Sequence, residues 1–195
     1  MTQPLGAIAY VNAAAELLGQ AQALGIHVDH VVTATSSGSM QAGLVAAAKL
    51  LNGGFRTTGI AVSGDTATLA ALVSEITSQV MRDEFGETGR LIEDDIMVND
   101  RYIGEGYGIT NAETMSAIST TAATEGLLLD PVYTGKAMRG LLDLAKRGYF
   151  KSGESVVFLH TGGLPALFPY RTELADYLSA QAKAGAEETA GSKRS

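Results

Sequence analysis

The chain has 195 residues, enough for one domain with a sizeable core or at most two small ones. Its formal net charge of -7 argues against a surface for nucleic acid or an anionic membrane, and the 14 basic residues are scattered. The absence of cysteine excludes disulfides and thiolate metal sites, and no metal site is expected.

Neither a signal peptide nor a membrane-spanning segment is recognisable. The N-terminus lacks a basic region, and polar side chains interrupt the apolar stretch from Leu5 to Leu24. No run approaches the ~20 apolar residues that a bilayer span requires. We therefore expect a cytoplasmic protein without a membrane partner.

Strands and helices alternate along the chain, which predicts a parallel sheet with helices on both faces. In chain order we expect helix 4–24, strand 30–35, helix 40–51, strand 56–62, helix 66–82, an extended segment 92–99, helix 112–124 after Asn111, helix 135–147, strand 155–159 and short helical pieces from residues 164 and 173. The expected fold class is α/β, a three-layer α/β/α arrangement around a mostly parallel open sheet.

No domain boundary is visible, so residues 1–181 are assigned to one domain. Residues 182–195 are small and polar and are expected to form a flexible tail. In open parallel sheets, ligands bind in the crevice beyond the carboxyl ends of the strands. Two loops rich in glycine and hydroxyl groups follow the strands that end at Thr35 and Leu159, and they mark candidate sites.

The first of these loops, Ser37-Gly38-Ser39-Met40, runs from a strand into a helix. Backbone N–H groups at a helix start bind phosphate, and small side chains let an anion approach them. The loop lacks both the Gly-Lys-Ser/Thr of a Walker loop and the Gly-x-Gly-x-x-Gly spacing of dinucleotide-binding folds. A plain turn is the alternative interpretation.

The second loop, His160-Thr161-Gly162-Gly163, allows close backbone approach to a ligand, or it is only a strand-to-helix turn. A third candidate is the Tyr133-Thr134 pair, which follows Pro131 at a helix start. Its phenol and hydroxyl could contact a flat ring at the end of the sheet. A loop tyrosine packed on its own domain is the alternative there.

Five segments together resemble the 1-aminocyclopropane-1-carboxylate deaminase / D-cysteine desulfhydrase family, whose members use pyridoxal 5'-phosphate and have the tryptophan synthase β-like fold. The segments are Pro4-Leu5-Gly6, Ser37–Gly43, Gly106–Ile109, Glu125–Ala137 and His160–Leu167. Their order and spacing match from about residue 4 to residue 175. The resemblance covers most of this chain but only a C-terminal part of the family's length.

The resemblance implies a cofactor-binding set and two tyrosines that line the substrate side of the cofactor ring. The cofactor-binding set is Ser37, Gly38, Ser39, Met40, Thr134 and Thr161, and the tyrosines are Tyr107 and Tyr133. The loop at Ser37 would hold the phosphate through backbone N–H groups. Thr134 would face the pyridine nitrogen, and Thr161 would lie close to both cofactor and substrate.

Two positions divide the family. The ring-opening deaminases carry Glu after the tyrosine and Leu after the histidine, whereas this chain has Thr134 and Thr161, the desulfhydrase-like choice. A carboxylate keeps the pyridine nitrogen protonated and makes a strong electron sink, while a threonine leaves it mostly neutral. A weaker sink is enough for α,β-elimination of a good leaving group.

The family's Schiff-base lysine lies in an N-terminal portion that has no counterpart in this sequence, and no lysine here stands in a matching context. We therefore expect a truncated or split lyase that is inactive alone and that associates with itself or with the missing part. The expected substrate is a small sulfur-bearing amino acid, first D-cysteine, then L-cysteate, then 1-aminocyclopropane-1-carboxylate. A non-catalytic remnant or subunit module is the rival interpretation.

Overall fold

The structure is a computed structural model that describes residues 4–89, 91 and 93–192. In chain order its elements are α1 (Pro4–Ala23), β1 (His30–Thr35), α2 (Ser39–Leu50), β2 (Arg56–Ala61), α3 (Thr66–Phe85), the 3-10 helix η1 (Glu93–Asp95), β3 (Met97–Asn99), α4 (Ala112–Glu125), α5 (Thr134–Lys146), β4 (Val156–Phe158), the 3-10 helix η2 (Leu164–Leu167) and α6 (Arg171–Ser192).

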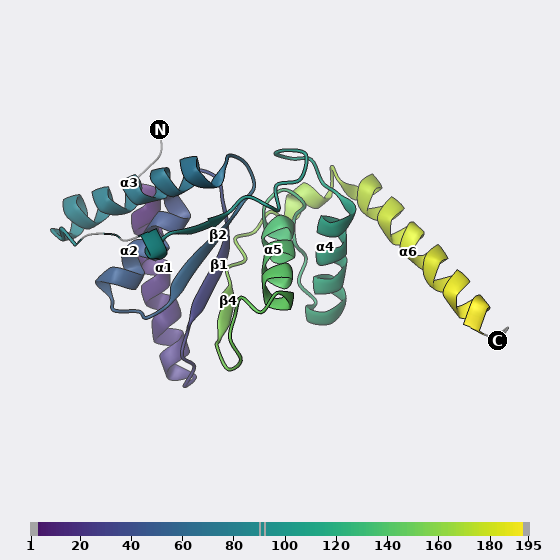
Figure 1. Ribbon diagram of the computed structural model, residues 1–195, viewed down its shortest axis with the longest axis horizontal. Helices are drawn as coiled ribbons and strands as arrows, with labels where there is room; N and C mark the ends of the chain where they lie inside the picture. Colours follow the sequence, from purple (N-terminus) through teal and green to yellow (C-terminus); the bar gives the residue numbers. More distant parts are fainter. Residues whose placement is uncertain (1–3, 90, 92, 193–195) are drawn as a thin grey trace.

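The four strands form one parallel sheet in the order β3-β2-β1-β4. His30 of β1 lies opposite Arg56 of β2 on one side and opposite Val156 of β4 on the other. Helices α1, α2 and α3 cover one face of the sheet, and α5, with α4 outside it, covers the other (Figure 1). The expected α/β fold class with a parallel sheet is therefore confirmed.

Apolar packing explains the layers. One core cluster joins α1, α2 and α3 to the sheet through residues such as Val31, Leu44 and Val73. A second lies between the sheet and α5, and a third between α4 and α5. All six residues of β1 are buried, whereas those of β4 are only half-buried, because β4 is at the edge of the sheet.

Two expected segments differ from the structure. Of the described residues in the expected extended segment 92–99, only Met97–Asn99 form a strand, because three others form η1 instead; residue 92 lies outside the described residues. The expected tail is helical as far as Ser192, since α6 continues through a segment rich in the good helix formers Ala, Glu and Lys. Residues 193–195 lie outside the described residues.

Helix α6 packs against the body only near its beginning and then projects away from it (Figure 1). Leu174 and Tyr177 contact the cluster between α4 and α5, and Leu178 is exposed. Within the described part of the chain, none of the helices has the length and apolar character that crossing a bilayer demands.

Candidate functional site

The candidate residues gather at the carboxyl edge of the sheet. β1 ends at Thr35, just before the Ser37 loop, and the neighbouring strand β4 ends at Phe158, just before Thr161. Parallel strands end at the same edge, so the two loops lie on the same side of the molecule. α5 begins at Thr134, beside the loop that follows β4, because Asp130 contacts both Thr134 and Gly163 of that loop.

The start of α2 has the features of an anion-binding site. Gly38 is its N-cap residue and supplies no side-chain hydrogen bond. By contrast, Asp65 caps α3 by accepting from the Thr68 N–H, and Asn111 caps α4 in the same way. Among the described residues, no side chain therefore accepts from the first N–H groups of α2, and a phosphate fits their donor chemistry.

The backbone of this loop, rather than its side chains, presents the donors. Gly38 has φ +77°, and a Cβ there would lie 3.3 Å from the Val73 side chain, so only glycine suits the position. The Met40 sulfur accepts a hydrogen bond from Thr33 Oγ1 at 2.8 Å, which turns its side chain back toward β1. Met40 can thus offer an anion only its N–H group, whereas Ser37 is exposed and Ser39 half-buried.

Tyr107 and Tyr133 are brought together from loops far apart in the sequence. Their hydroxyl oxygens lie 2.5 Å apart, and their rings meet edge to face with centroids 5.8 Å apart. Tyr107 is 55% exposed and Tyr133 38% exposed, so both phenols face solvent. The hydrogen bond with Tyr107, followed by desolvation, raises the pKa of Tyr133 to about 12. Tyr133 therefore remains protonated at neutral pH.

Thr134 is buried, unlike the neighbouring Tyr133. It is 1% exposed, and its hydroxyl donates to Asp130 Oδ1 at 2.7 Å and accepts from the Asp130 N–H at 2.8 Å. The Asp130 carboxylate also accepts the N–H groups of Val132, Tyr133 and Thr134 at 2.8 Å each. This buried carboxylate caps α5 and fixes the backbone that carries Tyr133.

The loop after β4 packs against the same carboxylate. Gly163 has φ +90°, and a Cβ there would lie 2.6 Å from Asp130 Cγ. His160 Nδ1 accepts from the Gly162 N–H at 3.1 Å, so its Nε2 carries the proton and donates to Leu128 O at 3.0 Å. His160 therefore fastens the loop, and Thr161 beside it is exposed.

No lysine in the described residues has a free amine at this edge. Lys136 is 1% exposed and donates to two carbonyl groups, so it is not available for a Schiff base. Lys49 pairs with Asp95 near the far end of α2. The remaining described lysines lie at the end of α5, before β4 and on the outer part of α6: Lys146, Lys151 and Lys183.

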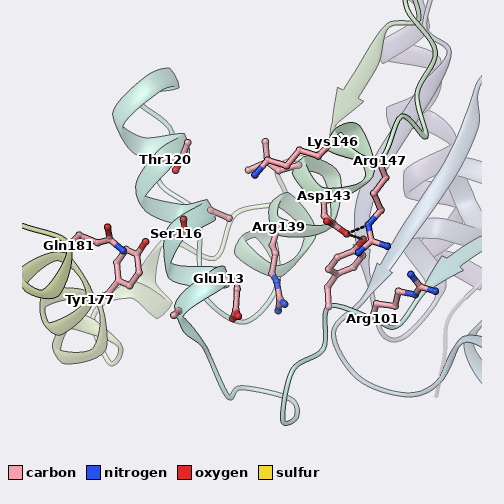
Figure 2. Close-up of a pocket in the computed structure, with 14 residues that line it drawn as sticks. Arg101, Glu113, Ser116, Thr120, Arg139, Asp143, Lys146, Arg147, Tyr177 and Gln181 are labelled. Atoms are coloured by element: carbon pink, nitrogen blue, oxygen red, sulfur yellow. Dashed lines mark hydrogen bonds and ion pairs between the residues drawn. The ribbon is translucent and has the colours of Figure 1, made fainter. Parts of the chain in front are cut away.

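A separate cavity of about 640 Å³ lies between α4, α5 and α6. Figure 2 shows Arg139 and Lys146 of α5, Ser116 of α4 and Tyr177 of α6 around it. None of the predicted site residues lines it. The described residues also contain no group of three His, Asp or Glu side chains that could hold a metal ion.

A family model described as "Pyridoxal-phosphate dependent enzyme" matches residues 1–162. The chain belongs to this family. Members of the family depend on pyridoxal phosphate, which confirms the cofactor expected from the sequence. The open start of α2, with its glycine and unclaimed N–H groups, is a suitable place for the phosphate of that cofactor.

Relatives within this pyridoxal-phosphate-dependent family include 1-aminocyclopropane-1-carboxylate deaminases. The chain is 36% identical over 174 residues to the one from Burkholderia multivorans, covering 89% of this chain and 51% of that protein. It is 37% identical over 166 residues to the one from Bradyrhizobium sp., covering 85% and 48%. The crystal structure of an ACC deaminase homologue matches with a TM-score of 0.78 at 31% identity, covering 90% of this chain and 51% of that chain. The chain thus spans about half the length of these relatives.

Two functional contributors were not given a role by sequence reasoning. Asp130 could have been recognised, because an aspartate shortly before a helix start is a common cap. Lys136 offered no comparable signal, since a lysine in the first turn of a helix ordinarily points to solvent.

Proposed function

We propose that this chain is the phosphate-binding C-terminal part of a pyridoxal-phosphate-dependent lyase that eliminates a sulfur substituent from a small amino acid. D-cysteine is the first candidate substrate, and L-cysteate is the second. The observation that carries the proposal is the meeting of an uncapped helix start, a hydrogen-bonded tyrosine pair and Thr161 at one edge of the sheet.

The bound cofactor would supply an electron sink for breaking bonds at the substrate's Cα. The N–H groups of Ser39 and Met40 at the start of α2 would bind its phosphate dianion, assisted by the helix dipole. The exposed Ser37 hydroxyl lies in the same loop and can add a further hydrogen bond. These contacts would hold the anion without a basic side chain from the described residues.

The tyrosine pair is suited to donate a proton. One of the two phenols donates to the other, which leaves one O–H group free for the substrate. Since the pKa of Tyr133 is raised to about 12, this phenol holds its proton at neutral pH and is suited to act as an acid rather than as a base. In the elimination, the free O–H would protonate the departing sulfur as the Cβ–S bond breaks.

The two threonines support elimination over ring opening. An alcohol in place of a carboxylate at position 134 would leave the pyridine nitrogen mostly neutral and the cofactor a weaker electron sink. A weaker sink is sufficient for elimination of a good leaving group. Thr134 could face the ring only after releasing one of its two contacts with Asp130. Exposed Thr161 needs no such change.

The second candidate is ring opening of 1-aminocyclopropane-1-carboxylate, which is favoured by the names of the relatives from Burkholderia and Bradyrhizobium. The test incubates the purified chain and pyridoxal phosphate with each substrate. The assays run with and without a second polypeptide that comprises the other half of the Burkholderia multivorans enzyme. Products are identified by mass spectrometry.

With the second polypeptide, D-cysteine and water should give pyruvate, ammonia and hydrogen sulfide, whereas the chain alone should give none. If only 2-oxobutanoate from the cyclopropane substrate appears, ring opening is the function. If no substrate is converted although both polypeptides bind each other, the chain is a non-catalytic module and the lyase proposal is wrong.

A partner is also proposed. Large apolar side chains are exposed near the tyrosine pair and the loop after β4; they are Ile109, Leu127, Leu128, Leu164 and Phe168. The amine that holds the cofactor must come from elsewhere, so we expect this surface to be covered by the missing part or by another copy of the chain. Light scattering measures the mass of the chain with and without the second polypeptide. A monodisperse monomer that does not bind the second polypeptide would contradict this proposal.

A further inference from the structure

Lys136 is the largest fully buried side chain in the described residues. It lies in the first turn of α5, and its Nζ donates to Ile103 O at 2.6 Å and to Gly106 O at 2.7 Å. No carboxylate within the described residues forms an ion pair with it. A lysine amine removed from water in this way requires strong acceptors, and two loop carbonyl groups supply them.

The two carbonyl groups belong to the loop that carries Tyr107. This loop, between β3 and α4, has no regular secondary structure and contains Gly104, Gly106 and Gly108. Each glycine increases the number of conformations open to the unrestrained loop. A restraint on Ile103 and Gly106 therefore limits where the next residue, Tyr107, is placed, from the side opposite to Gly108, whose carbonyl oxygen accepts from the Tyr170 hydroxyl.

The start of α5 carries both Tyr133 and the lysine that binds the loop of Tyr107. Tyr133 precedes α5, and Lys136 lies three residues further along. One helical turn therefore carries both the Tyr133 phenol and the amine that binds the Ile103–Gly106 loop. The phenol contact is exposed to solvent, where a single hydrogen bond contributes little. The two contacts of the buried ammonium are shielded from water and are correspondingly stronger.

We propose that Lys136 is a positioning residue whose ammonium holds the Ile103–Gly106 loop so that the Tyr107 hydroxyl meets that of Tyr133. The importance of this for catalysis rests on the proposed function, whereas the placement of Tyr107 does not. Burial and the nearby Arg139 lower the pKa of Lys136, which agrees with an amine enclosed by loop and helix. The amine thus assembles the site without touching substrate.

The test uses the full chain and two independent readouts. In Lys136→Met, a side chain of similar length keeps the packing but cannot donate to the carbonyl groups. Proton NMR contacts between the Tyr107 and Tyr133 rings should disappear, while circular dichroism shows an unchanged helix content. Lys146→Met, at the exposed end of the same helix, is the matched control and should keep the ring contacts. A folded Lys136→Met protein with intact ring contacts would overturn the proposal.

A second experiment does not depend on that variant folding. Acetylation of surface amines is followed by mass spectrometry, and Lys136 should react more slowly than exposed Lys146 by roughly tenfold or more. Tyr107→Ala removes an exposed side chain and should leave this protection unchanged, because the lysine holds the loop by its carbonyl groups. If Tyr107→Ala instead makes Lys136 as reactive as Lys146, the phenols hold the loop and the proposal is wrong.

Discussion

The Thr134 hydroxyl and the Asp130 carboxylate form a closed pair, in which the hydroxyl donates to Oδ1 and accepts from the Asp130 N–H. Thr134→Val would leave both Asp130 groups buried without that partner, at a cost of about 1–3 kcal/mol in the free energy of unfolding. Urea denaturation measures it. Thr124→Val is the control, because the Thr124 hydroxyl is an exposed helix contact, and its loss should change the stability little.

Gly163 is required both by its backbone and by its neighbour. Gly163 has φ +90°, and Gly163→Ala would place a methyl group 2.6 Å from Asp130 Cγ. Gly153 has the same φ of +90°, but a methyl group added there would meet nothing within 4 Å, so Gly153→Ala isolates the backbone strain, about 1–3 kcal/mol. Thermal unfolding should show a larger loss for Gly163→Ala. Equal losses would mean that the contact with Asp130 is irrelevant.

The tyrosine pair predicts a specific alkaline titration. The pKa of Tyr133 is raised from 10.0 to about 12, first by the hydrogen bond with Tyr107. In Tyr107→Phe the pKa of Tyr133 should fall toward 10.0, as followed by NMR of labelled tyrosines. Tyr102, whose pKa is raised to about 12 by burial and by Asp143, is the internal reference and should not move.

The same shift makes stability depend on alkaline pH. Between pH 10.0 and about 12 the folded protein binds more protons at Tyr133 than the unfolded chain, so its stabilising contribution is complete below this range and is lost as pH rises through it. Unfolding free energies measured by urea at several pH values should fall less steeply in Tyr133→Phe. An identical slope in both proteins would show that Tyr133 is not perturbed.

The open start of α2 predicts selective loss of phosphate binding. Ser39→Glu places a carboxylate where the cofactor phosphate is expected, so affinity for pyridoxal phosphate should fall by roughly tenfold or more. The same change should stabilise the helix slightly through its dipole. Ser78→Glu, on the exposed side of α3, adds equal charge elsewhere and should bind normally. Calorimetric titration distinguishes them, and equal affinities would place the phosphate elsewhere.

Much of the fold could be predicted because local signals agreed with tertiary packing. His30–Thr35 is a β-branched run that is buried on both faces, and its predicted bounds match β1. Asp65, directly before the predicted helix 66–82, is a common capping residue type, and it does accept the Thr68 N–H. The bounds of β3 were harder, because its three residues pair only with one neighbour at the edge of the sheet.

The candidate site was less predictable, since its geometry depends on contacts between distant segments. Tyr107 and Tyr133 are 26 positions apart, and only the folded loop brings their hydroxyl groups together. Lys136 is buried because Ile103 and Gly106 fold over it from 33 and 30 positions away. The sequence of α5 alone does not indicate that Lys136 is buried.

The position of β4 beside β1 has a consequence for how the molecule assembles. The Ser155 N–H donates to Asp29 across a separation of 126 residues, whereas β1 and β2 are joined through α2 alone. Pairings between distant residues form slowly, since a long loop must be closed first. We expect the segment from α1 to α3 to become ordered early and the strand that precedes Thr161 to dock last. The proposed phosphate-binding loop would then be ordered before Tyr107 and Tyr133 are in place.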